Sequence, residues 1–106
     1  WRHIHKRKIC FNKKDSLFIL SVGGGNKQKK VSTNLIKAID YGKKKKLKIF
    51  GVIGKKDGYT KKYGHNVIVI PEINKNFVTP YSEAFQAVIW HCLVSHPYLQ
   101  ENKTKW

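Results

Sequence analysis

The residues with the clearest chemical potential are three consecutive glycines between an apolar segment and a helical pattern, in FILSVGGGNKQKKVSTNLIKAI (residues 18–39). Glycines let the backbone approach an anion closely, and the N–H groups at the start of a helix favour negative charge. Ser32 adds a hydroxyl at that point, and Lys27, Lys29 and Lys30 raise the local positive potential. The stretch therefore predicts either a phosphate-binding loop or a plain strand-to-helix turn capped by Ser32.

Two further side chains could act as a general acid and a general base, Glu83 and His91 in the apolar segment 80–96. They are eight residues apart, which corresponds to about 12 Å along a helix. They therefore cannot bond each other directly, and a ligand would have to lie between them. The alternative for His91 is a structural histidine with a satisfied hydrogen bond.

The remaining metal-type residues give no recognisable site. His3 and His5 are separated by one residue in a charged segment without cysteine support. Cys10 and Cys92 have neither a metal-type spacing nor the number needed for a disulfide framework. We expect both cysteines to be reduced.

Charge is the strongest compositional feature, because 22 Lys and Arg face 6 Asp and Glu in 106 residues, for a net charge of +16. Such a balance suits a nucleic-acid partner, but the lysines fall mostly in connections, as in GKKKKLK, which is also typical of a solvated surface. No apolar run approaches the roughly 18 residues that a membrane span needs, and the N-terminal residues do not resemble a secretory signal. We expect a soluble, cytoplasmic protein with no membrane partner.

These residues must be positioned by alternating strands and helices. Apolar runs predict strands at 16–22, 47–53 and 66–71, and the segments between them predict a helix from Ser32 and a turn or short helix at 55–64. This alternation predicts an α/β fold with a parallel sheet in three layers, with helices on both faces. The first strand reads as buried on both faces.

Two features suggest that this unit is incomplete. Three parallel strands with apolar faces would leave a hydrophobic edge exposed, so we expect a partial domain at 15–99, with a basic lead-in at 1–14 and a tail at 100–106. The segment 80–96 is apolar nearly all round, so it should pack on the sheet and also on another helix, from a second subunit of a homo-oligomer.

The sequence resembles the sugar isomerase (SIS) domain family, most closely its members similar to sedoheptulose 7-phosphate isomerase (phosphoheptose isomerase). The resemblance runs from Asp15 to Leu99 and rests on LFILSVGGGN, VSTNLIKAI, KIFGVIGKKDGY and NVIVIPEINKNFVTPYSEAFQAVIWHCLVSHPYL. It implies a SIS or flavodoxin-like fold, of which this chain is the C-terminal half. It also implies binding of a phosphorylated sugar and cytoplasmic ketose–aldose isomerisation in the intact enzyme.

The resemblance assigns the glycine segment to the sugar phosphate. Ser21, Gly24 and Ser32 match the serine, glycine and last serine of the family's phosphate-binding segment, and Gly23 and Gly25 complete the set. In the family a threonine and a serine stand at the positions of Val22 and Gly23, so backbone N–H groups would contribute more here. The turn residues Gly54, Asp57 and Gly58 resemble a G-K-D-G-G turn of the family, and we interpret them as turn chemistry.

The resemblance leaves the catalytic and metal residues open. In some members a Gln and a later His of the last helix bind a divalent metal such as zinc. Here Ser82 stands where that Gln would be, Glu83 matches the family's glutamate, and His91 lies one position beyond the usual His. The metal therefore stays unknown, and the base and further ligands of the family lie in a half that this chain does not contain.

Three functions follow from the sequence. The first is the phosphosugar-binding half of an isomerase that is inactive alone, and the second is a non-catalytic phosphosugar-binding module. The third, a basic nucleic-acid-binding protein, would need its lysines in one stripe with interleaved aromatic residues.

Overall fold

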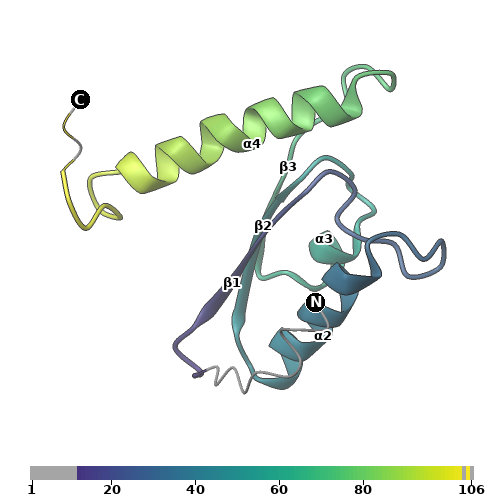
Figure 1. Ribbon diagram of the computed structural model, residues 1–106, viewed down its shortest axis with the longest axis horizontal. Helices are drawn as coiled ribbons and strands as arrows, with labels where there is room; N and C mark the ends of the chain where they lie inside the picture. Colours follow the sequence, from purple (N-terminus) through teal and green to yellow (C-terminus); the bar gives the residue numbers. More distant parts are fainter. Residues whose placement is uncertain (1–11, 104, 106) are drawn as a thin grey trace.

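The computed structural model describes residues 12–103 and 105, which form one parallel three-stranded sheet with four-residue to six-residue strands and three helices (Figure 1). The elements follow the order β1 (Ser16–Ser21), α2 (Thr33–Lys44), β2 (Lys48–Ile53), α3 (Tyr59–Tyr63), β3 (Asn66–Val69) and α4 (Val78–Ser95). The strand order is β1-β2-β3, and both pairs are parallel. The α/β class, the parallel sheet and the positions of all strands are thus confirmed, with each strand one or two residues shorter than expected.

Helices α2 and α3 cover one face of the sheet with apolar packing. Ile19 of β1, Ile49 of β2 and Ile39 of α2 form its buried centre, at exposures of 3%, 0% and 0%. Gly51 of β2 faces α3, and a Cβ there would lie 2.9 Å from the side chain of the buried Thr60. The missing side chain at this position therefore lets the short helix sit directly on the central strand.

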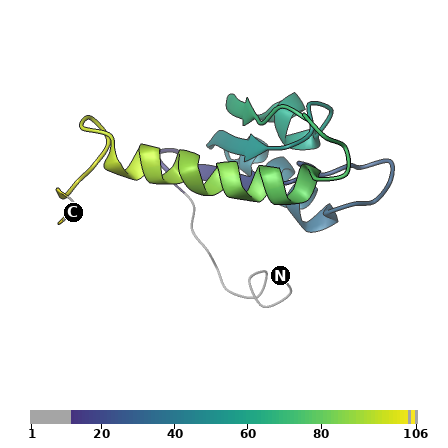
Figure 2. The same ribbon diagram turned by 90° about the horizontal axis from the view of Figure 1, so that it is seen from above.

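Helix α4 lies on the opposite face of the sheet (Figure 1), and Figure 2 shows it from above as one straight helix beside the strands. Only Ser82 and Gln86 of this helix are buried, and both are polar. A Cβ at Gly54, just after β2, would overlap the hydroxyl of Ser82. The amino-terminal half of α4 therefore approaches the sheet closely at the end of β2.

The expectation that β1 is buried on both faces is wrong. Phe18 and Leu20, on the α4 side, are each 46% exposed, whereas Ile19 on the other side is buried. The physical reason is that α4 packs mainly on β2, and β1 lies at the edge of the sheet. The helix partner expected for α4 does not lie within residues 12–103 and 105, where the sheet supplies its main contacts.

Candidate functional site

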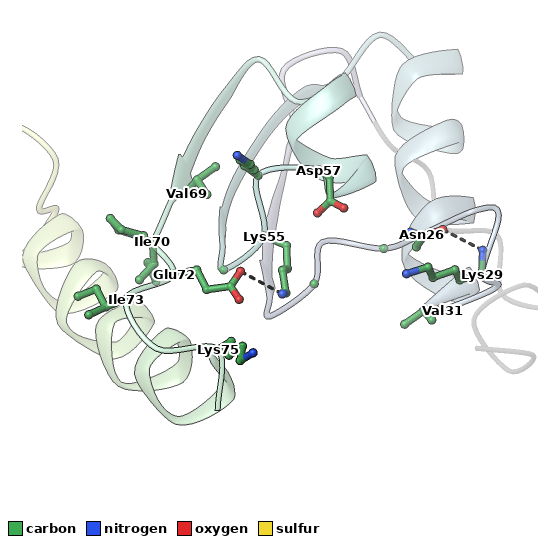
Figure 3. A pocket seen from close by; sticks show the side chains of 15 residues that line it. Asn26, Lys29, Val31, Lys55, Asp57, Val69, Ile70, Glu72, Ile73 and Lys75 are labelled. Carbon is green, nitrogen blue, oxygen red and sulfur yellow. Dashed lines mark hydrogen bonds and ion pairs between the residues drawn. The ribbon is translucent and has the colours of Figure 1, made fainter. Parts of the chain in front are cut away.

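The three loops that follow the strands meet at one edge of the sheet, because the carboxyl ends of parallel strands point the same way. They surround an open groove of about 930 Å³ (Figure 3). The loop after β1 contributes Gly23 and Gly25, the loop after β2 contributes Gly54 and Lys55, and the loop after β3 contributes Glu72. The groove therefore unites the glycine segment with loops that lie 30 and 48 residues further along the chain, counting from residue 24 to residues 54 and 72.

Gly24 is the buried residue of the glycine loop, and its contacts determine the conformation of the loop. Its φ is +73°, and a Cβ there would lie 3.2 Å from the Cα of Gly58. Its N–H donates to Ser21 Oγ at 3.0 Å, and its carbonyl accepts a hydrogen bond of 2.8 Å from Thr60 Oγ1. The serine hydroxyl and the central glycine thus hold the turn together and do not line the groove.

Gly23 and Gly25 are the glycines that face the groove. The space around Gly23 is open, since a Cβ there would have no neighbour within 4 Å, and Gly25 adopts a φ of +86°. Among residues 12–103 and 105, none accepts a hydrogen bond from the backbone N–H of either glycine. Neither N–H group is therefore engaged within that part of the chain; the half-buried Gly23 can donate to an anion in the groove, and Gly25 lies buried beside it.

The groove carries an excess of positive charge. Four lysines line it, against two carboxylates, and these are Lys29, Lys55, Lys56, Lys75, Asp57 and Glu72. Lys55 Nζ and Glu72 Oε2 form an ion pair of 3.1 Å that connects the loops after β2 and β3 (Figure 3). The N–H of Lys29 donates to Asn26 Oδ1 at 2.8 Å, which holds the lysine-rich loop beside the groove. An anion is the ligand that this arrangement favours.

A second, smaller hollow of about 500 Å³ lies beside the same loop, with Tyr59 and Tyr63 in its wall. The hydroxyl of Tyr59 donates a hydrogen bond to Asp40 of α2. This hydrogen bond, assisted by burial and by the negative charge of Asp40, raises the pKa of Tyr59 to about 12. Tyr59 therefore stays protonated and connects α2 to α3 near neutral pH.

Ser32 is the residue immediately before α2, but its side chain does not form a capping hydrogen bond with the helix. It adopts a left-handed conformation with a φ of 53°, and its carbonyl accepts the first bonds, from the N–H groups of Leu35 and Ile36. The predicted cap is wrong, because a capping side chain needs an extended backbone that points its oxygen at the first turn. Ser32 is exposed and is absent from the residues that line the groove.

The expected acid–base residues do not reach the groove either. Glu83 and His91 are exposed on α4, and the ring of His91 stacks on Trp90 at a centroid distance of 3.8 Å. Within the described part of the chain, no three His, Cys, Asp or Glu side chains gather into a metal site. Cys92 is an exposed free thiol, whereas His3, His5 and Cys10 lie outside the described residues.

Gln86, for which no role was predicted, connects helix α4 to two strands of the sheet. Its Nε2 donates to the carbonyl oxygens of Ser21 and Val52, both at 2.9 Å, and so joins α4 to the ends of β1 and β2. The available signal was a single amide among apolar neighbours in the last helix. A buried amide in such a position needs partners, and carbonyls at strand ends are suitable acceptors.

Gly58 closes the predicted turn, because its N–H donates to the carbonyl of Lys55 at 3.2 Å, but the reason for a glycine here is different. Its φ of −65° is open to any residue, but a Cβ would lie 2.5 Å from the carbonyl oxygen of Gly23. The glycine is therefore required by close packing of two loops at the groove, and not by turn conformation.

Comparison with known proteins adds no assignment, since no family model, curated protein or solved structure matches this chain. Across residues 12–103 and 105, no helix combines the length and apolarity needed to cross a membrane. The fold and the groove together define a parallel α/β unit with a cationic, glycine-lined site at the carboxyl edge of its sheet.

Proposed function

We propose that the groove binds a phosphorylated sugar and that this chain is the phosphosugar-binding part of a sugar isomerase of the SIS type. The observation that carries the proposal is the pair of unengaged N–H groups at Gly23 and Gly25 beside an excess of lysines. Both lie at the carboxyl ends of parallel strands, where open α/β sheets bind their ligands.

The dimensions and the polar groups of the groove support a ligand of this kind. Its volume of about 930 Å³ lies within the range of roughly 300–1,000 Å³ that is typical of small-molecule sites. Lys56 and Lys75 can attract the phosphate, because Lys55 already pairs with Glu72. Asn26 and Asp57 supply acceptors for sugar hydroxyls.

The groove supports binding better than it supports catalysis. Isomerisation through an enediol needs a base beside the reacting carbons and an acid beside the second oxygen. His91 and Glu83 do not line the groove, so the isomerase would need these groups from outside the described residues. A non-catalytic phosphosugar-binding module is therefore the second candidate function, because His91 and Glu83 lie away from the groove.

A nucleic-acid interface has less support. Lysines occur at both ends of the sheet, for example Lys43 to Lys46 at and just after the end of α2, and Lys55, Lys56 and Lys75 at the other end. This scatter over the connections favours a solvated basic surface over one continuous stripe.

Isothermal calorimetry can test the proposal with sedoheptulose 7-phosphate, sedoheptulose and inorganic phosphate as titrants. We expect the phosphorylated sugar to bind at least about tenfold more tightly than the free sugar, because charged hydrogen bonds contribute about 1.5–3 kcal/mol. Replacing Lys56 and Lys75 with Ala together should weaken binding of the phosphosugar by about tenfold. Replacing Lys44 and Lys48 with Ala together, at the opposite end of the sheet, removes the same number of charges and is the matched control, which should have no effect.

Two outcomes would contradict the proposal. Equal affinities for sedoheptulose and its phosphate would show that the groove does not hold the phosphate. An equal loss in the variant at Lys44 and Lys48 and in the groove variant would show that only the overall charge of the chain attracts the anion.

A further inference from the structure

The smaller hollow beside the carboxyl-edge groove differs from the groove in having aromatic walls. It measures about 500 Å³ and shares Gly25, Asn26 and Asp57 with the groove as a common border. Among the residues that the structure describes, no aromatic side chain lines the groove, whereas Tyr59 and Tyr63 of α3 line the smaller hollow. We call it the tyrosine hollow. Asn26 and Asp57 of the common border are visible in Figure 3. A cationic site and an aromatic site therefore adjoin at the glycine loop.

The two tyrosine rings are held in place before any ligand binds. Their centroids lie 4.5 Å apart with a tilt of 52° between the ring planes, and both rings pack against the buried isoleucine cluster under α2 and α3. The hydroxyl of Tyr59 donates to Asp40, and its backbone N–H donates to the carbonyl of Gly25 at 2.9 Å. A preformed aromatic wall loses little conformational entropy when a flat ring is placed against it.

The polar side chains of the tyrosine hollow match the edges of a nucleobase. Gln28, Asn26 and Asp57 line it together with the tyrosines. Asn26 Oδ1 accepts the N–H of Lys29 at 2.8 Å, which orients the amide of Asn26. Amide groups can pair with the amino group and ring nitrogen of adenine, and a carboxylate can accept a hydrogen bond from a base amino group. Aromatic rings stack on the flat face of a base. The residue types therefore favour adenine over a simple anion.

The charge around the tyrosine hollow indicates that such a base carries phosphate. Lys27 and Lys62 line the hollow, and Asp57 is the one carboxylate among its described lining residues. Lys43 Nζ and Lys62 Nζ lie 3.7 Å and 5.3 Å from the centroid of the Tyr63 ring. The lysines of the groove continue this positive charge on the other side of the common border. A negative group attached to the base is therefore favoured over a neutral ligand.

We propose that the tyrosine hollow binds the adenine base of a nucleotide and that the phosphates of this nucleotide extend across the common border into the groove. The volume of the hollow lies within the range of roughly 300–1,000 Å³ that is typical of small-molecule sites. The proposal goes beyond phosphosugar binding, because it needs the positive charge of the groove but no sugar phosphate.

Isothermal calorimetry of the whole chain with ADP tests the proposal, with inorganic pyrophosphate as the base-free reference and no divalent metal present. We expect ADP to bind at least about fivefold more tightly than pyrophosphate, because the base adds stacking on the tyrosines. Tyr63→Leu should remove most of this difference and leave the affinity for pyrophosphate unchanged. Tyr41→Leu is the matched control and should bind ADP like the parent chain. Tyr41 lies on α2 with Lys45 Nζ 5.7 Å from its ring centroid, and it lines neither hollow.

Photolabelling keeps the test valid if circular dichroism shows that Tyr63→Leu fails to fold. Irradiation of the parent chain with 8-azido-ADP should label residues 25–28 or 57–63, as located by mass spectrometry, and excess ADP should prevent the labelling. Labelling elsewhere, such as on α4, would overturn the proposal.

Three calorimetric results would also overturn the proposal. The first is an ADP affinity no higher than that for pyrophosphate, and the second is an equal loss of ADP affinity in Tyr63→Leu and Tyr41→Leu. The third is a loss of sedoheptulose 7-phosphate binding in Tyr63→Leu as large as the loss of ADP binding, because the hollow would then hold the sugar. A chain that binds ADP as expected but no sedoheptulose 7-phosphate would contradict the proposed function alone.

Discussion

The two faces of the sheet hold their helices in different ways. On one face, Ile39 of α2 packs on Ile49 of β2, and both side chains are completely buried. On the other face, the buried residues of α4 are the polar Ser82 and Gln86, which meet the ends of the strands. Apolar packing is non-directional, whereas an amide must meet its carbonyls at defined angles.

The helices on the two faces of the sheet therefore have distinct roles. The α2 and α3 side supplies most of the burial that stabilises the sheet, since the buried cluster of Ile19, Ile39 and Ile49 lies there. The contacts of α4 concentrate near the carboxyl ends of β1 and β2, at Gly54 and Gln86. Helix α4 is therefore aligned by a few specific contacts beside the groove.

The largest expected effect tests the apolar side. Ile49→Ala should lower the free energy of unfolding by about 3–4 kcal/mol, because it removes a fully buried side chain and leaves a cavity. Val88→Ala, on α4 and 55% exposed, should cost less than about 1 kcal/mol. Urea unfolding of both variants, at concentrations where the chain is monomeric, measures the difference. Equal losses would show that the two faces are packed alike.

Gly54→Ala tests the close approach of α4 to the sheet. The added methyl group would overlap the hydroxyl of Ser82, so we expect a loss of about 2–3 kcal/mol, in the range typical of overpacking. Gly23→Ala, where a Cβ meets nothing within 4 Å, is the matched control and should change stability by less than about 1 kcal/mol. Thermal unfolding of both variants distinguishes a steric effect from a general glycine effect.

Gln86→Leu tests the directional attachment itself. The substitution keeps an apolar body of similar size but removes two donated hydrogen bonds, and it leaves the carbonyls of Ser21 and Val52 buried without this partner. We expect a loss of about 2 kcal/mol, the scale of unsatisfied buried acceptors. Gln28→Leu, in an exposed loop, should be nearly neutral in the same chemical denaturation. A stabilised Gln86→Leu variant would mean that α4 is held by apolar contact.

The smallest effect concerns the connection between α2 and α3. Tyr59→Phe removes the hydrogen bond to Asp40 and should cost about 1 kcal/mol at neutral pH. The pKa of Tyr59 in the folded chain is raised from 10.0 to about 12. The stability that this bond contributes is therefore complete below pH 10 and is lost as the pH rises towards 12. Unfolding curves between pH 9 and pH 12 should converge for the parent and Tyr59→Phe.

The sequence was sufficient for the fold class, because apolar runs of strand length alternate with helical patterns and tight loops. The exposure of Phe18 and Leu20 could not be predicted from that pattern. The same apolar run is expected in a strand whose two faces are both covered by the chain and in a strand that leaves one face exposed. Only the position of α4 over β2 reveals that the edge strand is left uncovered.

The candidate site was predictable in part. The glycine loop was correctly placed beside a strand end, but the lysines at positions 55, 56 and 75 gave no local signal of a shared groove. Their proximity comes from parallel pairing, which brings separate loops to one edge. The role of Ser32 depends on its left-handed backbone conformation. The role of Gln86 depends on hydrogen-bond acceptors from two different strands. Neither can be inferred from local sequence.

The register of the sheet has a consequence for the order in which the chain folds. Phe50 of β2 pairs with Asn66 of β3, 16 residues later, whereas Ser16 of β1 pairs with Lys48, a separation of 32 residues. Doubling the length of a closed loop adds about 0.6 kcal/mol of entropic cost, so the unit β2–α3–β3 closes first. When the complete chain refolds, β1 therefore joins after β2 and β3 have paired, whereas in a growing chain the apolar β1 stays exposed until β2 has emerged.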